Sequence, residues 1–213
     1  MTNKTSLKNE LIFQYAAGTA SLSKSLMAAT YLFLNSRESS TYSQFEGYCA
    51  EEFKNVTQIK PINLKPSDCL DALEEKNYNQ KKTQNPINNF IDNLKEIKWK
   101  KVFNGFYEHS FDLSNKERAK LIKMQPGAKV PLHTHNGKEF ILVLEGSFSD
   151  EYGTYSRGDL QINDSRIKHT PVSCPEKGCI CLTITENDLV FFGPFAPLLN
   201  IFTLFTSFFK SKK

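Results

Sequence analysis

Four side chains that could bind a metal ion stand in two short segments: His133, His135 and Glu139 in the first, and His169 in the second. His133 and His135 are two residues apart, so on an extended strand both imidazoles lie on one face. The Asn136-Gly137 pair predicts a tight turn, which brings Glu139 back toward the histidines. Imidazole nitrogens with one carboxylate oxygen suit a first-row metal ion. The spacing therefore predicts a metal site, and His169 is the candidate fourth ligand.

Short predicted strands surround these ligands in the second half of the chain. Turn residues such as Pro126-Gly127 and Glu145-Gly146 separate the strands. Many short strands divided by such turns favour a sandwich or barrel, here of jelly-roll type. The predicted strands are 98–102, 105–113, 118–124, 140–144, 155–162, 180–184 and 190–192.

The first half of the chain predicts helices instead. Apolar residues recur at helical spacing over residues 7–35, where Ser6 and Ser21 can each cap a helix. A third helix is predicted over 39–53, and a short one from Ser67 to Leu73. The predicted fold class is α+β: an N-terminal helical bundle followed by a C-terminal jelly-roll β-barrel.

The helix that starts after Ser21 is apolar on two faces. One face can pack within its own domain, and the other can bind a second protein, because a large exposed apolar face marks an interaction site. The alternative is that both faces belong to the core. The candidate partner-binding residues of the helical region are Leu11, Tyr15, Leu26, Met27 and Tyr31.

The polar segment Lys76–Asn85 has no periodicity and is the predicted linker. It closes a helical domain over residues 1–85, and a metal-binding domain follows over 86–195. Residues 196–213 form an apolar and basic tail. The uncharged stretch Leu189–Phe209 has the nominal length of a membrane span, but prolines interrupt it. We therefore expect this tail to pack against protein and not to enter a membrane.

Composition limits the remaining classes of protein. Of the 213 residues, 39% are hydrophobic and 12% aromatic, which excludes wholesale disorder. The net charge of +4 is spread along the chain and gives no argument for direct nucleic-acid binding. Because the first residues lack the apolar run of a signal peptide, we expect a cytoplasmic protein. Cys179 and Cys181 share one face of a predicted strand and are candidate redox thiols, unless they are inert core residues.

The spacing of the metal-ligand segment matches the first cupin motif: Gly127, five residues, His133-Thr134-His135, three residues, Glu139, six residues, Gly146. The segment Gly153–His169, GTYSRGDLQINDSRIKH, resembles the second cupin motif. It departs from the usual pattern at Ser156, where a proline is common. Ser173 also replaces a common asparagine. Both positions shape turns and are not ligands.

The resemblance extends to one family, the ChrR-type anti-sigma factors. The sequence from Pro131 to Thr185 is similar to the cupin half of that family, and ELIFQYAAGTA at 10–20 is similar to the start of its helical domain. This resemblance implies a helical domain that binds an extracytoplasmic-function sigma factor. It also implies a cupin domain that senses singlet oxygen or organic hydroperoxides through one metal ion bound by the four residues named above.

One departure from the family concerns a second zinc site, which the family carries in its helical domain. The aligned positions here hold Tyr31, Asn35 and Glu38, which cannot form a zinc site of the thiolate and imidazole kind. We therefore expect one divalent metal ion per chain. Zinc is the first choice, with iron and manganese as alternatives.

Two other functions remain open from the sequence. The chain could be a metal-dependent enzyme of the cupin dioxygenase kind, or a cupin that only binds a small ligand. Beyond the metal ligands no general acid or base is clear, and the candidates are Glu108, Glu145 and Asp159. The helical region favours the regulator, because a minimal cupin enzyme does not need it, whereas the degenerate zinc motif favours the alternatives.

Overall fold

The computed structural model describes residues 4–55, 86–113, 117–194 and 196–197. It begins with helices α1 (Lys4–Ala16), α2 (Leu22–Leu34) and α3 (Ser39–Asn55), with the 3-10 turn η1 (Ser36–Glu38) between the last two. The helix α5 (Pro86–Asp92) and the 3-10 turn η2 (Asn93–Glu96) lead into the strands. The predicted helix at Ser67–Leu73, the linker, and most of the C-terminal tail lie outside the described residues. The division of the chain into domains therefore stays a prediction.

Of the two predicted helix caps, Ser21 is confirmed and Ser6 is not. Ser21 caps α2 as predicted, because its hydroxyl accepts a hydrogen bond from the Lys24 backbone N–H at 3.2 Å. Ser6 does not cap α1, which already begins at Lys4. No helix breaker precedes Ser6, and each residue added to an existing helix gains one hydrogen bond. Helix α5 was missed, although Pro86 at its first position is a start signal.

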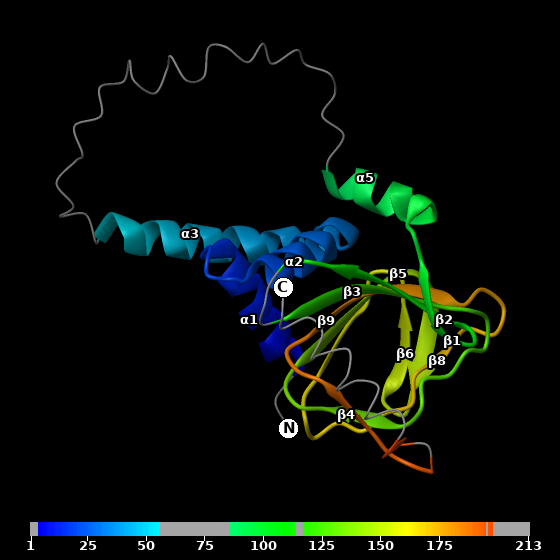
Figure 1. Cartoon of the computed structure of the whole chain (residues 1–213). Helices are drawn as coiled ribbons and strands as arrows, with labels where there is room; N and C mark the ends of the chain where they lie inside the picture. Colours follow the sequence, from blue (N-terminus) through cyan, green and yellow to red (C-terminus); the bar gives the residue numbers. More distant parts are fainter. Residues whose placement is uncertain (1–3, 56–85, 114–116, 195, 198–213) are drawn as a thin grey trace.

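The strands form one large antiparallel sheet and one small one (Figure 1). The order in the large sheet is β1-β2-β3-β9-β5-β6, with β7 and β8 also paired to β5, while β4 pairs with β10. The predicted strand over 155–162 is divided in two by a turn at Gly158. The strand bounds are β1 (Lys100–Phe103), β2 (Phe106–Phe111), β3 (Arg118–Met124), β4 (His133–His135), β5 (Glu139–Asp150), β6 (Gly153–Ser156), β7 (Leu160–Asn163), β8 (Val172–Ser173), β9 (Cys179–Thr185) and β10 (Leu189–Phe191).

Side chains of the large sheet alternate between two apolar environments. The outer face packs against α1 and α2, as Figure 1 shows, so the helices and the sheet share one core. The inner face turns toward β4 and β10 and encloses a second, smaller core. The predicted α+β fold is thus confirmed. The outer core includes Leu11, Ile12, Met27, Tyr31, Phe140, Leu142, Leu144, Leu182 and Ile184.

This arrangement decides where the candidate partner-binding residues lie. Leu11, Met27 and Tyr31 are buried in the core that α1 and α2 share with the sheet, and Tyr15 and Leu26 are partly buried there. For Met27 and Tyr31 the structure therefore matches the alternative that both faces of the second helix are core. The helix face that carries Met27 and Tyr31, which was a candidate for binding a second protein, is covered by the chain's own sheet.

The positions aligned with the family's second zinc site form a polar junction at the end of α2. The Asn35 amide donates to the backbone carbonyls of Tyr31 at 3.0 Å and Gly158 at 2.9 Å. Lys8 pairs with Glu38 at 2.6 Å, and burial together with Glu38 raises the pKa of Tyr31 to about 12. Direct hydrogen bonds and an ion pair therefore join α1, the end of α2 and the β6–β7 turn here.

Candidate metal centre

The four predicted ligands come from three adjacent segments. His133 and His135 lie on β4, Glu139 is the first residue of β5, and His169 lies in the loop before β8. The backbones of His133 and His169 exchange two hydrogen bonds of 3.1 Å, so these two residues hold each other in register. On the other edge of β4, Phe191 of β10 is opposite His133. The ligand-bearing strand is thus fixed on both sides.

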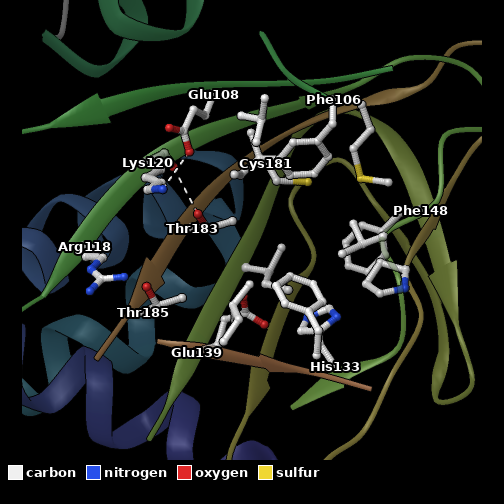
Figure 2. Close-up of a pocket in the computed structure, with 18 of the residues that line it drawn as sticks. Phe106, Glu108, Arg118, Lys120, His133, Glu139, Phe148, Cys181, Thr183 and Thr185 are labelled. Atoms are coloured by element: carbon white, nitrogen blue, oxygen red, sulfur yellow. Dashed lines mark hydrogen bonds and ion pairs between the residues drawn. The ribbon is translucent and has the colours of Figure 1, made fainter. Parts of the chain in front are cut away.

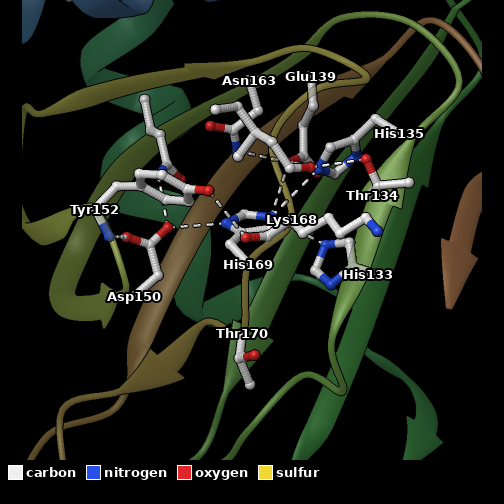
Figure 3. A network of polar contacts seen from close by, with 12 residues as sticks. His133, Thr134, His135, Glu139, Asp150, Tyr152, Asn163, Lys168, His169 and Thr170 are labelled. Carbon is white, nitrogen blue, oxygen red and sulfur yellow. Dashed lines mark hydrogen bonds and ion pairs between the residues drawn. The ribbon is translucent and has the colours of Figure 1, made fainter. Parts of the chain in front are cut away.

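The four side chains converge on one point in the interior (Figure 3). The Nε2 atom of His169 is 3.1 Å from that of His133 and 3.2 Å from that of His135. His135 Nε2 is also 3.1 Å from Glu139 Oε2. All four ligand atoms lie within 4.8 Å of one another, and all four residues are buried. Within the described part of the chain, this is the one group of metal-ligating side chains that converges in this way.

The hydrogen bonds at Nδ1 of His133 and His169 determine which ring nitrogen carries the proton. His133 Nδ1 is 2.9 Å from the Pro131 carbonyl, and His169 Nδ1 is 2.8 Å from Asp150 Oδ2. Because a carbonyl and a carboxylate only accept, both Nδ1 atoms donate, and each neutral ring presents a lone pair at Nε2. Two lone pairs then face each other across 3.1 Å with no proton between them. A cation between the rings would remove this repulsion.

The protonation states of the side chains at this site also suit metal binding. Burial and the neighbouring imidazoles lower the pKa of His133 to about 4 and that of His135 to about 3, so both rings are neutral at pH 7, as ligation requires. Burial raises the pKa of Glu139 to about 7, and the nearby His169 ring and the Asn163 amide offset only part of this rise. The donor set therefore fits one metal ion, and these four residues can hold it.

Sequence reasoning missed the side chains that orient the ligands. Asp150 accepts from His169 Nδ1 and, at 2.7 Å, from the amide of Gln161. The Asn163 amide donates to Glu139 at 3.3 Å, because Asn163 lies opposite Glu139 in the β5–β7 register. Figure 3 shows Asp150 next to His169 and Asn163 next to Glu139. No local signal in the sequence marks Gln161 or Asn163, since their role depends on strand register.

We predict that Asp150→Asn weakens metal affinity. The substitution keeps the shape of the side chain but removes the charge that supports His169, and losing such an outer partner costs about 10–100-fold in metal affinity. Competition for zinc against a chelator measures the change. The matched control is Asp164→Asn, because Asp164 pairs with Arg166 outside the metal centre. Equal zinc affinities of the two variants would contradict the role of Asp150 in supporting His169.

The metal centre opens onto a cavity of about 190 Å³ inside the barrel (Figure 2). His133 and Glu139 form part of its wall. Of the general acid–base candidates, Glu108 lines the cavity, where it pairs with Lys120 at 2.6 Å. Glu145 and Asp159 are not among the lining residues, and Asp159 is exposed. Neither of these two carboxylates is placed to act on a molecule in the cavity.

The two candidate redox thiols lie on β9, and both are buried. Cys181 lines the cavity. Its contact with Cys179 and its burial raise the pKa of the Cys181 thiol well above the usual value. The thiolate is the reactive form, so Cys181 is held in its unreactive state at neutral pH. The redox role of the two thiols remains a prediction.

We expect Cys174 to be alkylated faster by iodoacetamide than Cys179 and Cys181 in the folded protein. Cys174 is only partly buried, and the backbone N–H groups of Glu176 and Lys177 lower the pKa of its thiol. Timed alkylation followed by peptide mass spectrometry measures the order, and repeating it in urea supplies the control in which the three rates converge. Faster labelling of Cys181 than of Cys174 would contradict the lowered pKa of one thiol and the raised pKa of the other.

Comparison with known proteins extends the ChrR-type resemblance to most of the chain. Residues 88–187 match the ChrR cupin-like domain. A curated relative, the anti-sigma-E factor ChrR of Cereibacter sphaeroides, is 28% identical over 207 residues, which cover 93% of this chain and 97% of the relative. A crystal structure of Rhodobacter sphaeroides SigE in complex with the anti-sigma ChrR matches with 27% identity and a TM-score of 0.68, covering 83% of this chain and 96% of that chain.

These matches include the helical region as well as the barrel, since the coverage far exceeds the cupin domain alone. Within the described residues, no helix is long and apolar enough to cross a membrane. The sequence motifs, the buried group of three histidines and a glutamate, and the near full-length matches agree on one family. Residues 88–187 are a ChrR cupin-like domain, and the chain as a whole is similar in sequence and structure to the ChrR-type anti-sigma factors.

Proposed function

We propose that this chain is a cytoplasmic anti-sigma factor that sequesters an extracytoplasmic-function sigma factor through its helical region. The observation that carries the proposal is similarity over nearly the full length of both this chain and the curated relative. The matched crystal structure contains that type of protein in complex with SigE. The curated relative is an anti-sigma factor and not an enzyme.

The cupin domain supplies the regulatory input in this proposal. One divalent ion, for which we propose zinc, is held by His133, His135, Glu139 and His169. When bound, this ion supplies a Lewis-acidic position beside the cavity, where a small oxidant-derived molecule can be recognised. The chain's own contribution is to keep the imidazoles neutral and to exclude bulk water by burial. Singlet oxygen or an organic hydroperoxide is the proposed signal that releases the sigma factor.

Two surfaces of the helical region can bind the sigma factor, and only one of them requires the helices to separate from the sheet. Binding through Leu11, Met27 and Tyr31 requires α1 and α2 to leave the sheet that covers these residues. Binding through Phe13 and Tyr48 does not, since these side chains are 41% and 66% exposed. Solvent exposure of the outer-face side chains of β9 separates the two modes, because only the first mode uncovers these side chains on complex formation.

Co-expression with a sigma factor encoded beside the gene tests the proposal. A stable complex that co-purifies under reducing conditions is expected, and loss of the metal ligands in His133→Ala/His135→Ala is expected to alter its release by oxidant without abolishing assembly. The control is His109→Ala, because His109 lies on β2 and contacts the Lys98 carbonyl outside the metal centre. Absence of any complex with the unmodified chain would overturn the anti-sigma assignment.

A further inference from the structure

The cavity beside the metal centre has the size and the polarity of a binding site for a small molecule. Its volume of about 190 Å³ lies below the roughly 300–1,000 Å³ of pockets that hold drug-sized ligands. Its walls come from both sheets, and they include His133 and Glu139 of the metal centre (Figure 2). Any occupant is therefore small and lies next to the metal ligands.

One end of the cavity is polar and carries charged side chains. The register of β3, β9 and β5 places Arg118, Thr185 and Glu139 in one row, and Lys120 lies two residues further along β3 on the same inner face. The side chains of Arg118 and Lys120 are 32% and 28% exposed, so solvent reaches this end. A charged group that enters here meets the Lys120 ammonium and the Arg118 guanidinium, which pairs with Asp188.

The opposite end of the cavity is apolar. Further along β3, Ile122 and Met124 continue the inner face, and Phe106 of β2 is opposite Met124. Phe148 of β5 completes this wall, as Figure 2 shows for Phe106 and Phe148. Such a surface gains free energy when an apolar group displaces water from it. The cavity as a whole thus suits a molecule with one polar end and one apolar end.

The charges of the lining indicate the sign of the polar end. Within the lining, Glu108 and Glu139 offset the charges of Arg118 and Lys120, and Asp188 outside the lining pairs with Arg118. A divalent ion bound at the metal centre would leave this cavity with an excess of positive charge, which an anion would neutralise. Lys120 has three N–H donors, and its 2.6 Å bond to Glu108 Oε2 uses one of them. A carboxylate can accept from Lys120 in addition to that bond.

We propose that the cavity binds a small monocarboxylic acid with an apolar body. Its carboxylate lies at the Arg118 and Lys120 end, and its body lies among Ile122, Met124 and Phe148. This assignment rests on the proposed metal centre, and it gives the proposed regulator a ligand class that the family relationship does not supply.

Titration calorimetry on the full-length, zinc-loaded chain tests the ligand class with three probes. Hexanoate carries both the charge and the apolar body, 1-hexanol carries only the body, and acetate carries only the charge. We expect saturable binding of hexanoate, and binding at least tenfold weaker for the other two. Absence of saturable hexanoate binding would overturn the proposal. Equal binding of acetate would also overturn it, because the apolar end would then contribute nothing.

Two substitutions with opposite expected effects locate the carboxylate. Lys120→Met removes a charge-assisted bond, which corresponds to about tenfold weaker hexanoate binding or more. Glu108→Gln removes the competing carboxylate, so it should strengthen hexanoate binding, and it keeps the test decisive if Lys120→Met does not fold. Neither change should affect 1-hexanol. The control is Lys123→Met, because Lys123 lies 5.6 Å over the Trp99 ring and not in the cavity.

The outcomes separate this inference from the proposed function. If hexanoate fails to bind while zinc and the sigma factor are both still bound, only the ligand class is overturned. If hexanoate binds with the expected probe order but no sigma factor forms a complex, the cavity assignment stands and the regulatory function fails. Unchanged hexanoate affinity in both Lys120→Met and Glu108→Gln would show that the carboxylate does not bind at the Arg118 and Lys120 end of the cavity.

Discussion

Glu139→Gln is expected to stabilise the metal-free protein by about 3 kcal/mol at pH 8 while it weakens metal binding. Burial raises the pKa of the Glu139 carboxyl from 4.5 to about 7. Each pKa unit corresponds to about 1.4 kcal/mol, so the ionised carboxylate opposes folding by roughly 3 kcal/mol once the pH exceeds 7. Glutamine keeps the size of the side chain and carries no charge, so it removes this cost.

The raised pKa of Glu139 determines how the free energy of unfolding of the metal-free protein changes with pH. A carboxyl with a raised pKa in the folded state binds its proton more tightly there than in the unfolded chain. Its penalty is therefore absent below pH 4.5, grows as the pH rises to about 7, and stays constant above that pH. The lowered pKa values of His133 and His135 destabilise the folded state at acid pH in both proteins, so they largely cancel in the comparison.

Urea unfolding at pH 4 and pH 8, with and without zinc, measures both halves of this prediction. Without zinc the two proteins should differ little at pH 4, and the variant should be the more stable at pH 8. With zinc the order should reverse, because bound metal stabilises the folded wild type by mass action and the amide is a poorer ligand. The control is Glu145→Gln on the same strand, where the carboxylate is only half-buried. A destabilised metal-free Glu139→Gln protein at pH 8 would contradict the raised pKa of this carboxyl.

Most of the convergence at the candidate metal centre could be predicted from the sequence, because local geometry brings three of the four residues together. Two histidines at alternate positions of a strand and a glutamate just after a tight turn meet without help from distant residues. His169 required the resemblance to the second cupin motif. Asp150 and Asn163 could not be predicted, because one contacts His169 across 19 positions of sequence and the other depends on the β5–β7 register.

The contact between the helices and the sheet was also beyond the sequence pattern. An apolar stripe shows that a helix face is covered, but not by what. Met27 and Tyr31 fit a partner-binding stripe as well as a core stripe. The structure covers them with the outer face of the chain's own sheet, whose alternate residues Leu142, Leu182 and Ile184 are fully buried. Only the pairing of distant strands creates that apolar face.

A large loss of stability is also expected when Gly146, the glycine that ends the first cupin motif, is replaced. Gly146 and Gly127 both have a left-handed backbone, with φ of 67° and 70°. A methyl group at Gly127 would meet nothing within 4 Å, whereas one at Gly146 would lie 2.1 Å from the Gly178 carbonyl oxygen. We therefore predict that Gly127→Ala costs about 1–2 kcal/mol, the usual penalty of this conformation, and that Gly146→Ala costs more than about 4 kcal/mol.

The comparison separates backbone conformation from close packing, because the two glycines share the first and differ in the second. Gly146 is opposite Cys179 in the β5–β9 pairing, on the strand that begins with Glu139. An alanine there must push β5 away from the turn at Gly178, so we expect zinc affinity to fall together with stability. Gly127→Ala should retain zinc, since nothing near it has to move. Urea unfolding and zinc titration of both variants measure these effects, and equal losses would mean that the motif requires only a left-handed residue at position 146.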